Sequence, residues 1–136
     1  MKSIIDENNL SVTSSIKGTL PRVPFIAIRD ALLGKKFELS VSFVGAKKSK
    51  ELNNKFRNKN KPTNILSFEH SKTSGELILH LDTIKKDAPK FEMNLSAFTT
   101  FLVIHGCLHL KGMAHGSIME KYEKKYFEQI AKKPLP

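Results

Sequence analysis

Three of the five histidines lie within eleven residues of one another, at positions 105, 109 and 115. His105 and His109 are four residues apart, so on a helix their imidazoles project from the same face and can share an ion. Gly112 can adopt the left-handed conformation that ends a helix, which would bring His115 back as a third ligand. The spacing therefore predicts one divalent metal ion bound by His105, His109 and His115.

Three neutral imidazoles leave one position of a tetrahedral ion open for water, which is typical of catalytic rather than structural sites. An ion held in this way activates water as a nucleophile and stabilises charge on the group attacked. We expect Zn²⁺, with Ni²⁺ or another transition metal as the alternative. The competing interpretation is three unconnected core histidines, but burying two imidazoles side by side is costly unless something satisfies both.

The same spacing matches the zinc-protease pattern H-E-x-x-H-x-x-G-x-x-H, with Gly112 and His115 at the glycine and the third histidine. Gly106 stands where the general-base glutamate is needed, so peptide hydrolysis would lack its usual proton acceptor. A metalloprotease is therefore the less favoured hydrolase.

The remaining thiol and imidazole groups are expected to be structural. Cys107 points to a different helix face from the two flanking histidines, which favours packing over metal binding. His70 and His80 lie in or next to predicted strands and are interpreted as structural or surface residues.

The hydrophobic pattern predicts the elements that position the histidines. Helices are expected where apolar residues recur at helical spacing between capping signals, over residues 23–33, 46–57, 94–110 and 118–131. Strands are expected over residues 38–44, 64–68 and 76–81. Residues 1–20 show no convincing period and are left unassigned, although they could hide a strand.

The pattern also predicts which side of each helix faces the core. The helix over residues 94–110 is apolar on all sides, so we expect it to be central and buried, with Asn94 or Ser96 as its cap. The helix over residues 46–57 should turn Leu52 and Phe56 toward a sheet. The last helix should begin with a capping box at Ser117 and should bury four residues, namely Met119, Tyr122, Tyr126 and Ile130.

Length and composition indicate a single folded domain over residues 1–136. Lysine and arginine outnumber aspartate and glutamate by 23 to 13, giving a net charge of +10, which favours polyanionic partners. The single cysteine excludes an intramolecular disulfide, and neither a signal peptide nor a membrane span is indicated. We therefore expect a cytoplasmic protein with no membrane partner.

Several segments resemble one known family. Residues 105–115 read H-G-C-L-H-L-K-G-M-A-H and resemble the H-G-x-L-H-L-x-G-Y-D-H signature of the YbeY family of ribosomal RNA endoribonucleases. Leu52-Asn53, Arg57 and residues 61–68 are similar to the family's L-N-x-x-(Y/F)-R and P-T-(D/N)-V-L-S-F segments. Residues 75–78 give a weaker match to its G-D-I segment.

The resemblance implies an α+β domain in which a small mixed β-sheet packs against helices. It also implies metal-dependent cleavage of single-stranded RNA, in maturation of the 3′ end of small-subunit (16S) ribosomal RNA and in ribosome quality control. Single-stranded or ribosomal RNA and the small ribosomal subunit would be the partners. Carried over by position, His105, His109 and His115 would bind the metal, and Arg57 and His115 would be catalytic.

Arg57 suits a phosphodiester substrate, because a guanidinium fork can hold two phosphate oxygens and stabilise the additional charge of the transition state. The segment of residues 47–61 around it contains six lysines and a single acid, Glu51. With Arg57, Lys59 and Lys61 are the predicted substrate-binding residues, since such a cluster follows an RNA backbone. A solvated lysine face is the alternative interpretation.

The chain departs from the family pattern at Met113-Ala114, which replaces the Y-D before the last histidine. Any role of that carboxylate is then absent or supplied elsewhere, with Glu69, Glu76 and Glu120 as candidates. A vestigial site would leave a non-catalytic ribosome assembly factor with a structural metal. The sequence therefore favours an endoribonuclease, with the assembly factor and the metalloprotease as alternatives.

Overall fold

Three parallel strands form the middle of a mixed five-stranded sheet in the computed structural model, which describes residues 1–136. The strand order is β1-β2-β3-β5-β4, and the two outer strands β1 and β4 are antiparallel to their neighbours. The strands are β1 (Lys2–Glu7), β2 (Leu10–Ser14), β3 (Glu38–Phe43), β4 (Ile65–Ser71) and β5 (Ser74–Leu79). The predicted α+β class with a small mixed sheet is confirmed.

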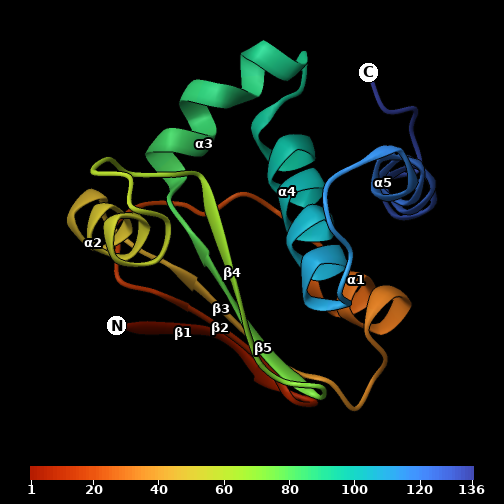
Figure 1. Cartoon of the computed structure of the whole chain (residues 1–136), viewed down its shortest axis with the longest axis horizontal. Helices are drawn as coiled ribbons and strands as arrows, with labels where there is room; N and C mark the ends of the chain where they lie inside the picture. The colour runs from red at the N-terminus through yellow and green to blue at the C-terminus, as the bar shows by residue number, and fades with distance from the viewer.

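Helices cover the two faces of this sheet unequally (Figure 1). On one side lie α1 (Phe25–Leu32), α4 (Leu95–Leu110) and α5 (Ser117–Ala131), which share the main core with the sheet. On the other side α2 (Ala46–Arg57) covers a smaller cluster of Val44, Leu66 and Ile78. The short α3 (Leu81–Asp87) and the 3₁₀ turn η1 (Ala88–Phe91) lead from β5 to α4.

Helix α4 lies between the sheet and α5, which explains why its sequence is apolar on all sides. Phe98, Ile104 and Leu108 are fully buried although they point in different directions around the helix. The Asn94 side chain accepts a hydrogen bond of 2.8 Å from the amide of Ala97, which confirms Asn94 as the helix cap. The helix that contains His105 and His109 is thus central and buried.

A buried arginine fixes α1 to the edge of the sheet. The Arg29 side chain is 1% exposed and forms an ion pair of 2.8 Å with Asp30. It also donates to the carbonyl of Asn8 at 2.7 Å and to that of Phe37 at 3.0 Å. These contacts satisfy a charge that would otherwise be costly to bury, and they join α1 to the turn after β1 and to the entry of β3.

Two chain segments contain elements that the sequence pattern does not predict. Within the unassigned residues 1–20, Lys2–Ser14 form the β1–β2 hairpin, in which Asn8 and Asn9 have φ values of +49° and +65°. Both values lie in the left-handed region that a two-residue type I′ turn requires. The expected strand over residues 76–81 ends at Leu79, because Leu81 already begins α3.

The predicted inward faces of two helices are correct only in part. On α2, Leu52 packs against the small cluster on the sheet as predicted, whereas Phe56 is 55% exposed. The buried residues of this helix are Ser49 and Asn53. On α5, the fully buried line is Met119, Glu123 and Phe127. The predicted residues Tyr122, Tyr126 and Ile130 flank that line and are half-buried.

The predicted capping box at Ser117 is wrong. Gly116 occupies the N-cap position of α5, and no side chain accepts a hydrogen bond from the first turn. The reason is that the chain arrives at α5 from the loop carrying His115, and Ser117 is already helical.

No single helix is long and apolar enough to cross a membrane. Leu81–Phe91 and Leu95–Leu110 are together long and apolar enough, but the chain bends by 101° between them.

Candidate metal centre

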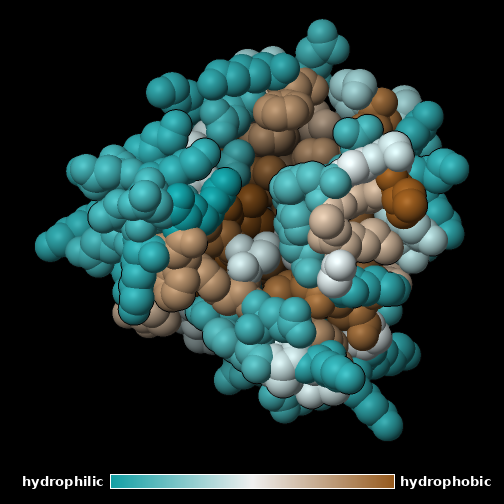
Figure 2. All heavy atoms as spheres, in the orientation of Figure 1, coloured by the Kyte–Doolittle hydropathy of each residue, from teal (hydrophilic) through white to brown (hydrophobic).

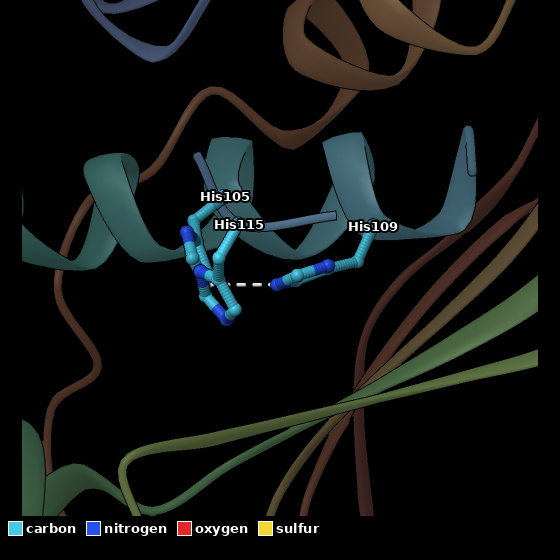
Figure 3. Close-up of side chains that lie close together, drawn as sticks. All are labelled: His105, His109 and His115. Carbon is cyan, nitrogen blue, oxygen red and sulfur yellow. Dashed lines mark hydrogen bonds between the residues drawn. The ribbon is translucent and has the colours of Figure 1, made fainter. Parts of the chain in front are cut away.

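The three predicted histidines come together at one end of α4. His105 and His109 project from the last turns of this helix, and Gly112 follows it with a φ of +100°. The left-handed glycine reverses the chain, as predicted, so that His115 returns over the other two rings. One ligand nitrogen from each histidine lies within 4.8 Å of the others, and Figure 3 shows the three imidazoles converging.

Hydrogen bonds on the outer ring nitrogens orient two of these imidazoles. His105 Nδ1 lies 2.5 Å from Glu123 Oε2, and His109 Nδ1 lies 2.9 Å from the carbonyl oxygen of Met113. A carboxylate and a carbonyl can only accept, so both Nδ1 atoms carry protons and donate. Each ring then presents its Nε2 lone pair to the centre of the cluster.

This donor set fits a transition-metal ion. The Nε2 atoms of His105 and His109 are only 3.1 Å apart, which makes a hydrogen bond if one ring carries a second proton (dashed line in Figure 3). When both rings are neutral, two lone pairs face one another at that distance, and a metal cation can bind both. His115 completes a group of three imidazoles whose ring centroids are separated by 4.6 to 5.0 Å. Three imidazole donors with a position left for water suit zinc and related ions.

The pKa of His109 is lowered from its ordinary value, mainly because burial disfavours the charged ring. The neighbouring His105 and His115 lower it further, while the Met113 carbonyl and Glu123 act in the opposite direction. A lowered pKa keeps the imidazole neutral, which is the form that binds a metal.

Glu123 is the site residue that sequence reasoning missed. It reaches His105 from α5 and is 7% exposed, while Ala114 stands at the position where the family pattern has aspartate. None of the three predicted substitutes fills this role: Glu76 pairs with His70 at 3.3 Å, and Glu69 and Glu120 are exposed. The sequence signal that could have found Glu123 is helical spacing. Glu123 follows the buried Met119 by four residues, so both lie on the same inward face of the helix.

Arg57 lies in the same cavity as the three histidines. The cavity has a volume of about 460 Å³, and its lining consists of the histidines, Phe56 and Arg57 from α2, and residues 65–68 of β4. The Arg57 guanidinium is exposed and has a single long contact of 3.5 Å with Thr63 Oγ1. The structure thus brings the predicted cation and the predicted metal ligands together.

Hydrogen bonds from α2 fix the loop that follows Arg57. Ser49 Oγ donates to the carbonyl of Thr63 and accepts from its amide, both at 3.0 Å. Asn53 Nδ2 donates to the carbonyl of Lys61 at 2.8 Å. The Lys59 and Lys61 side chains are exposed and lie outside the cavity lining, so their contact with substrate stays a prediction.

The local packing of α4 disfavours the protease interpretation. A Cβ atom at Gly106 would lie 2.7 Å from Leu77 Cδ2 and 3.0 Å from Ile65 Cδ1. Position 106 therefore faces the sheet and has no room for the glutamate that a zinc protease needs. Cys107 is fully buried, and burial raises the pKa of its thiol to about 12, so it packs in the core as expected.

The other two histidines lie apart from the cluster. His70 is exposed on β4 beside Glu76. His80 is buried before the first turn of α3, and its Nδ1 lies 2.7 Å from Thr83 Oγ1. Both are structural or surface residues, as predicted.

Comparison with known proteins identifies a family that the chain matches. Residues 5–133 match the family model described as "Endoribonuclease YbeY". The Endoribonuclease YbeY of Colwellia psychrerythraea is 37% identical over 99 residues, which cover 68% of this chain and 64% of that protein. That of Francisella philomiragia is 30% identical over 140 residues, covering 91% of this chain and 89% of the relative.

A solved structure supports the fold separately. The solution structure of TM1509 from Thermotoga maritima superposes with a TM-score of 0.64 at 24% identity. The superposition covers 90% of this chain and 89% of that one.

Proposed function

The chain belongs to the YbeY family, and we propose that it is a metal-dependent endoribonuclease that cleaves single-stranded RNA. The observation that carries this proposal is the cavity shared by Arg57 and the three histidines. A triad of imidazoles alone suits many hydrolases, whereas a free guanidinium beside it suits a phosphodiester.

Each residue has a defined part in the proposed reaction. When bound to the imidazoles, a divalent ion supplies an activated water molecule and a Lewis acid. Arg57 binds the phosphate oxygens through its fork and stabilises the charge that develops there. His115 comes from a loop rather than from α4 and is the one exposed imidazole of the three, so it is the ligand most open to solvent and the one proposed to act on the substrate. Glu123 holds the ring of His105 in position.

The charge around the cavity supports an RNA substrate. All seven cations of residues 47–61 are exposed, and none of them forms an ion pair. They are therefore free to meet backbone phosphates. A second hollow of about 480 Å³ contains three acids, Asp6, Glu38 and Glu76, and does not suit a polyanion.

The proposed substrate, cellular process and compartment follow the family resemblance. We propose that the substrate is the 3′ region of small-subunit (16S) ribosomal RNA, that the protein acts in ribosome quality control, and that it does so in the cytoplasm on or near the small subunit. We propose Zn²⁺ as the metal, on the basis of the three imidazole donors.

A cleavage assay with defined oligoribonucleotides tests the main proposal. Metal-loaded protein should cut single-stranded RNA and leave the same sequence intact in a duplex. Chelation and His109→Ala should both abolish cleavage, and readdition of metal should restore only the unmutated protein. Cleavage that survives both treatments would overturn the metal mechanism. Elemental analysis of the loaded protein distinguishes zinc from nickel.

The second candidate is a ribosome assembly factor in which the metal is structural. It is favoured by Ala114, which removes the carboxylate of the family pattern. Cosedimentation with small subunits, unchanged by Arg57→Glu and without detectable nuclease activity, would support it. The contact of Glu123 with His105 weighs against this candidate, because a carboxylate still orients the site.

A further inference from the structure

Phe56 exposes an aromatic ring at the wall of the cavity that contains the histidines. Its side chain is 55% exposed, although the residue belongs to a regular helix that packs on the sheet. In Figure 2, apolar side chains line the bottom of the central hollow between the α2 side and the α4 side of the molecule. An exposed aromatic ring at this place calls for an explanation beyond folding.

The Phe56 ring is held by one aromatic contact, although more than half of the residue is exposed. It meets Phe68 of β4 edge to face, with ring centroids 4.9 Å apart and an interplanar angle of 62°. Phe68 lines the same cavity and packs on the small core under α2. The contact therefore fixes the orientation of Phe56 while leaving more than half of its surface for a ligand.

Positive charge flanks the ring on both sides in the sequence. The ammonium of the exposed Lys55 lies over the Phe56 ring, 5.2 Å from its centroid, where an entering base would displace it toward a phosphate. Arg57 follows directly and lines the cavity. An aromatic ring between two cations matches a nucleotide, whose base can stack while the adjoining phosphates meet the charges.

We propose that Phe56 forms a stacking subsite for one nucleobase of single-stranded RNA, next to the phosphodiester that is cleaved. This inference rests on the endoribonuclease function proposed above and names how its substrate is held. The subsite takes an unpaired base, because a base must leave its helix to stack on a protein side chain. It explains a preference for single strands without any sequence-specific contact.

An apolar side chain of a protein partner is the other occupant that the exposed ring could accept. The charges argue against it, because seven unpaired cations and a single acid occupy residues 47–61. A peptide would gain little from them, whereas an RNA strand would neutralise them.

Two matched probes test the subsite on metal-loaded protein. One is a fluorescein-labelled 2′-O-methyl oligoadenylate of about eight nucleotides, within the usual length of a single-strand site. The other has the same backbone and charge but no bases. Fluorescence anisotropy gives both affinities, and a gel checks that each probe stays intact.

Phe56→Ala should weaken binding of the oligoadenylate about 5- to 150-fold, which corresponds to about 1–3 kcal/mol for one stacked base. Binding of the abasic probe should be unchanged. Phe56→Trp should retain the affinity for bases, while Phe56→Leu, which keeps apolar area without a π face, should lose part of it.

Phe91→Ala is the matched control, since Phe91 is 48% exposed and lies outside this cavity. Equal affinity of Phe56→Ala and the unmutated protein for the oligoadenylate would overturn the subsite, and so would a parallel loss on the abasic probe. In either case, cleavage of RNA by the unmutated protein would leave the endoribonuclease proposal standing. Failure of the unmutated protein to bind the oligoadenylate would also overturn the subsite.

Discussion

Glu123 Oε2 lies 2.5 Å from His105 Nδ1, although the two residues belong to different helices. The carboxylate accepts the ring proton and leaves His105 Nε2 free for a metal. The family pattern has its acid in the loop before the last histidine, where this chain has Ala114. A carboxylate beside the metal ligands is thus present in this chain, although it comes from α5.

Glu123→Gln should lower metal affinity about 10- to 100-fold, because the amide keeps the shape but replaces the charged acceptor of the His105 Nδ1 proton with a weaker, neutral one. Competition against a chelating dye measures the affinity directly. Glu120→Gln on the same helix is the control, since Glu120 is exposed and its side chain makes no hydrogen bond or ion pair. Unchanged affinity in the Glu123 variant would remove this residue from the metal centre.

Arg57→Ala should reduce kcat for RNA cleavage about 100- to 1000-fold, the usual cost of removing one donor that stabilises transition-state charge. Arg57→Lys should recover only part of this, because an ammonium lacks the fork that holds two oxygens. Thermal unfolding should be nearly unchanged in both variants, since the guanidinium is exposed. Full activity in the alanine variant would contradict the role proposed for Arg57.

Lys59→Ala should weaken binding of all RNA sequences equally and should flatten the salt dependence of binding. Removing one phosphate contact on a single strand lowers the slope of log K against log salt by about 0.7. Affinities measured between low and moderate salt give this slope. Lys133→Ala is the control, because the C-terminal end of the chain lies on the opposite side of the molecule from α2 (Figure 1). Identical slopes for the two variants would place Lys59 outside the RNA path.

The histidine cluster could be predicted because its geometry is local. Helical spacing places His105 and His109 on one face, and the left-handed Gly112 returns His115, all within one helix and one turn. Helix α2 was likewise predicted with its observed bounds, Ala46–Arg57. Arg57 could be assigned to the site only from the family resemblance, because the packing of α2 beside β4 is a long-range contact that no local pattern reveals.

Glu123 escaped prediction because a buried carboxylate breaks the apolar pattern of an inward helix face. The pattern instead favoured Tyr122 and Tyr126, which are only half-buried. The cost of burying Glu123 is offset by His105, a partner on another helix that no periodicity reveals. The N-terminal hairpin was missed for a different reason: β1 is almost wholly exposed, so it shows no alternation, and the signal lay in the Asn8-Asn9 turn.

Gly106→Ala tests whether α4 depends on close approach to the sheet. Helix propensity alone predicts a gain of about 1 kcal/mol for this change. Packing predicts the opposite sign, because the new Cβ would lie 2.7 Å from Leu77 Cδ2 and 3.0 Å from Ile65 Cδ1. Both atoms belong to the buried core and cannot withdraw freely, and overpacking of this kind costs about 1–3 kcal/mol.

We therefore expect Gly106→Ala to lower the free energy of unfolding by about 1 kcal/mol after the propensity gain is subtracted. Urea denaturation of the metal-free protein measures this value without a contribution from metal binding. Gly45→Ser is the matched control: its φ is −78°, no atom lies within 4 Å of an added Cβ, and serine can cap α2. That variant should be at least as stable as the unmutated protein. A stabilised Gly106→Ala would mean that α4 does not rest on β4 and β5 as closely as described, and the histidines would then lose their fixed support.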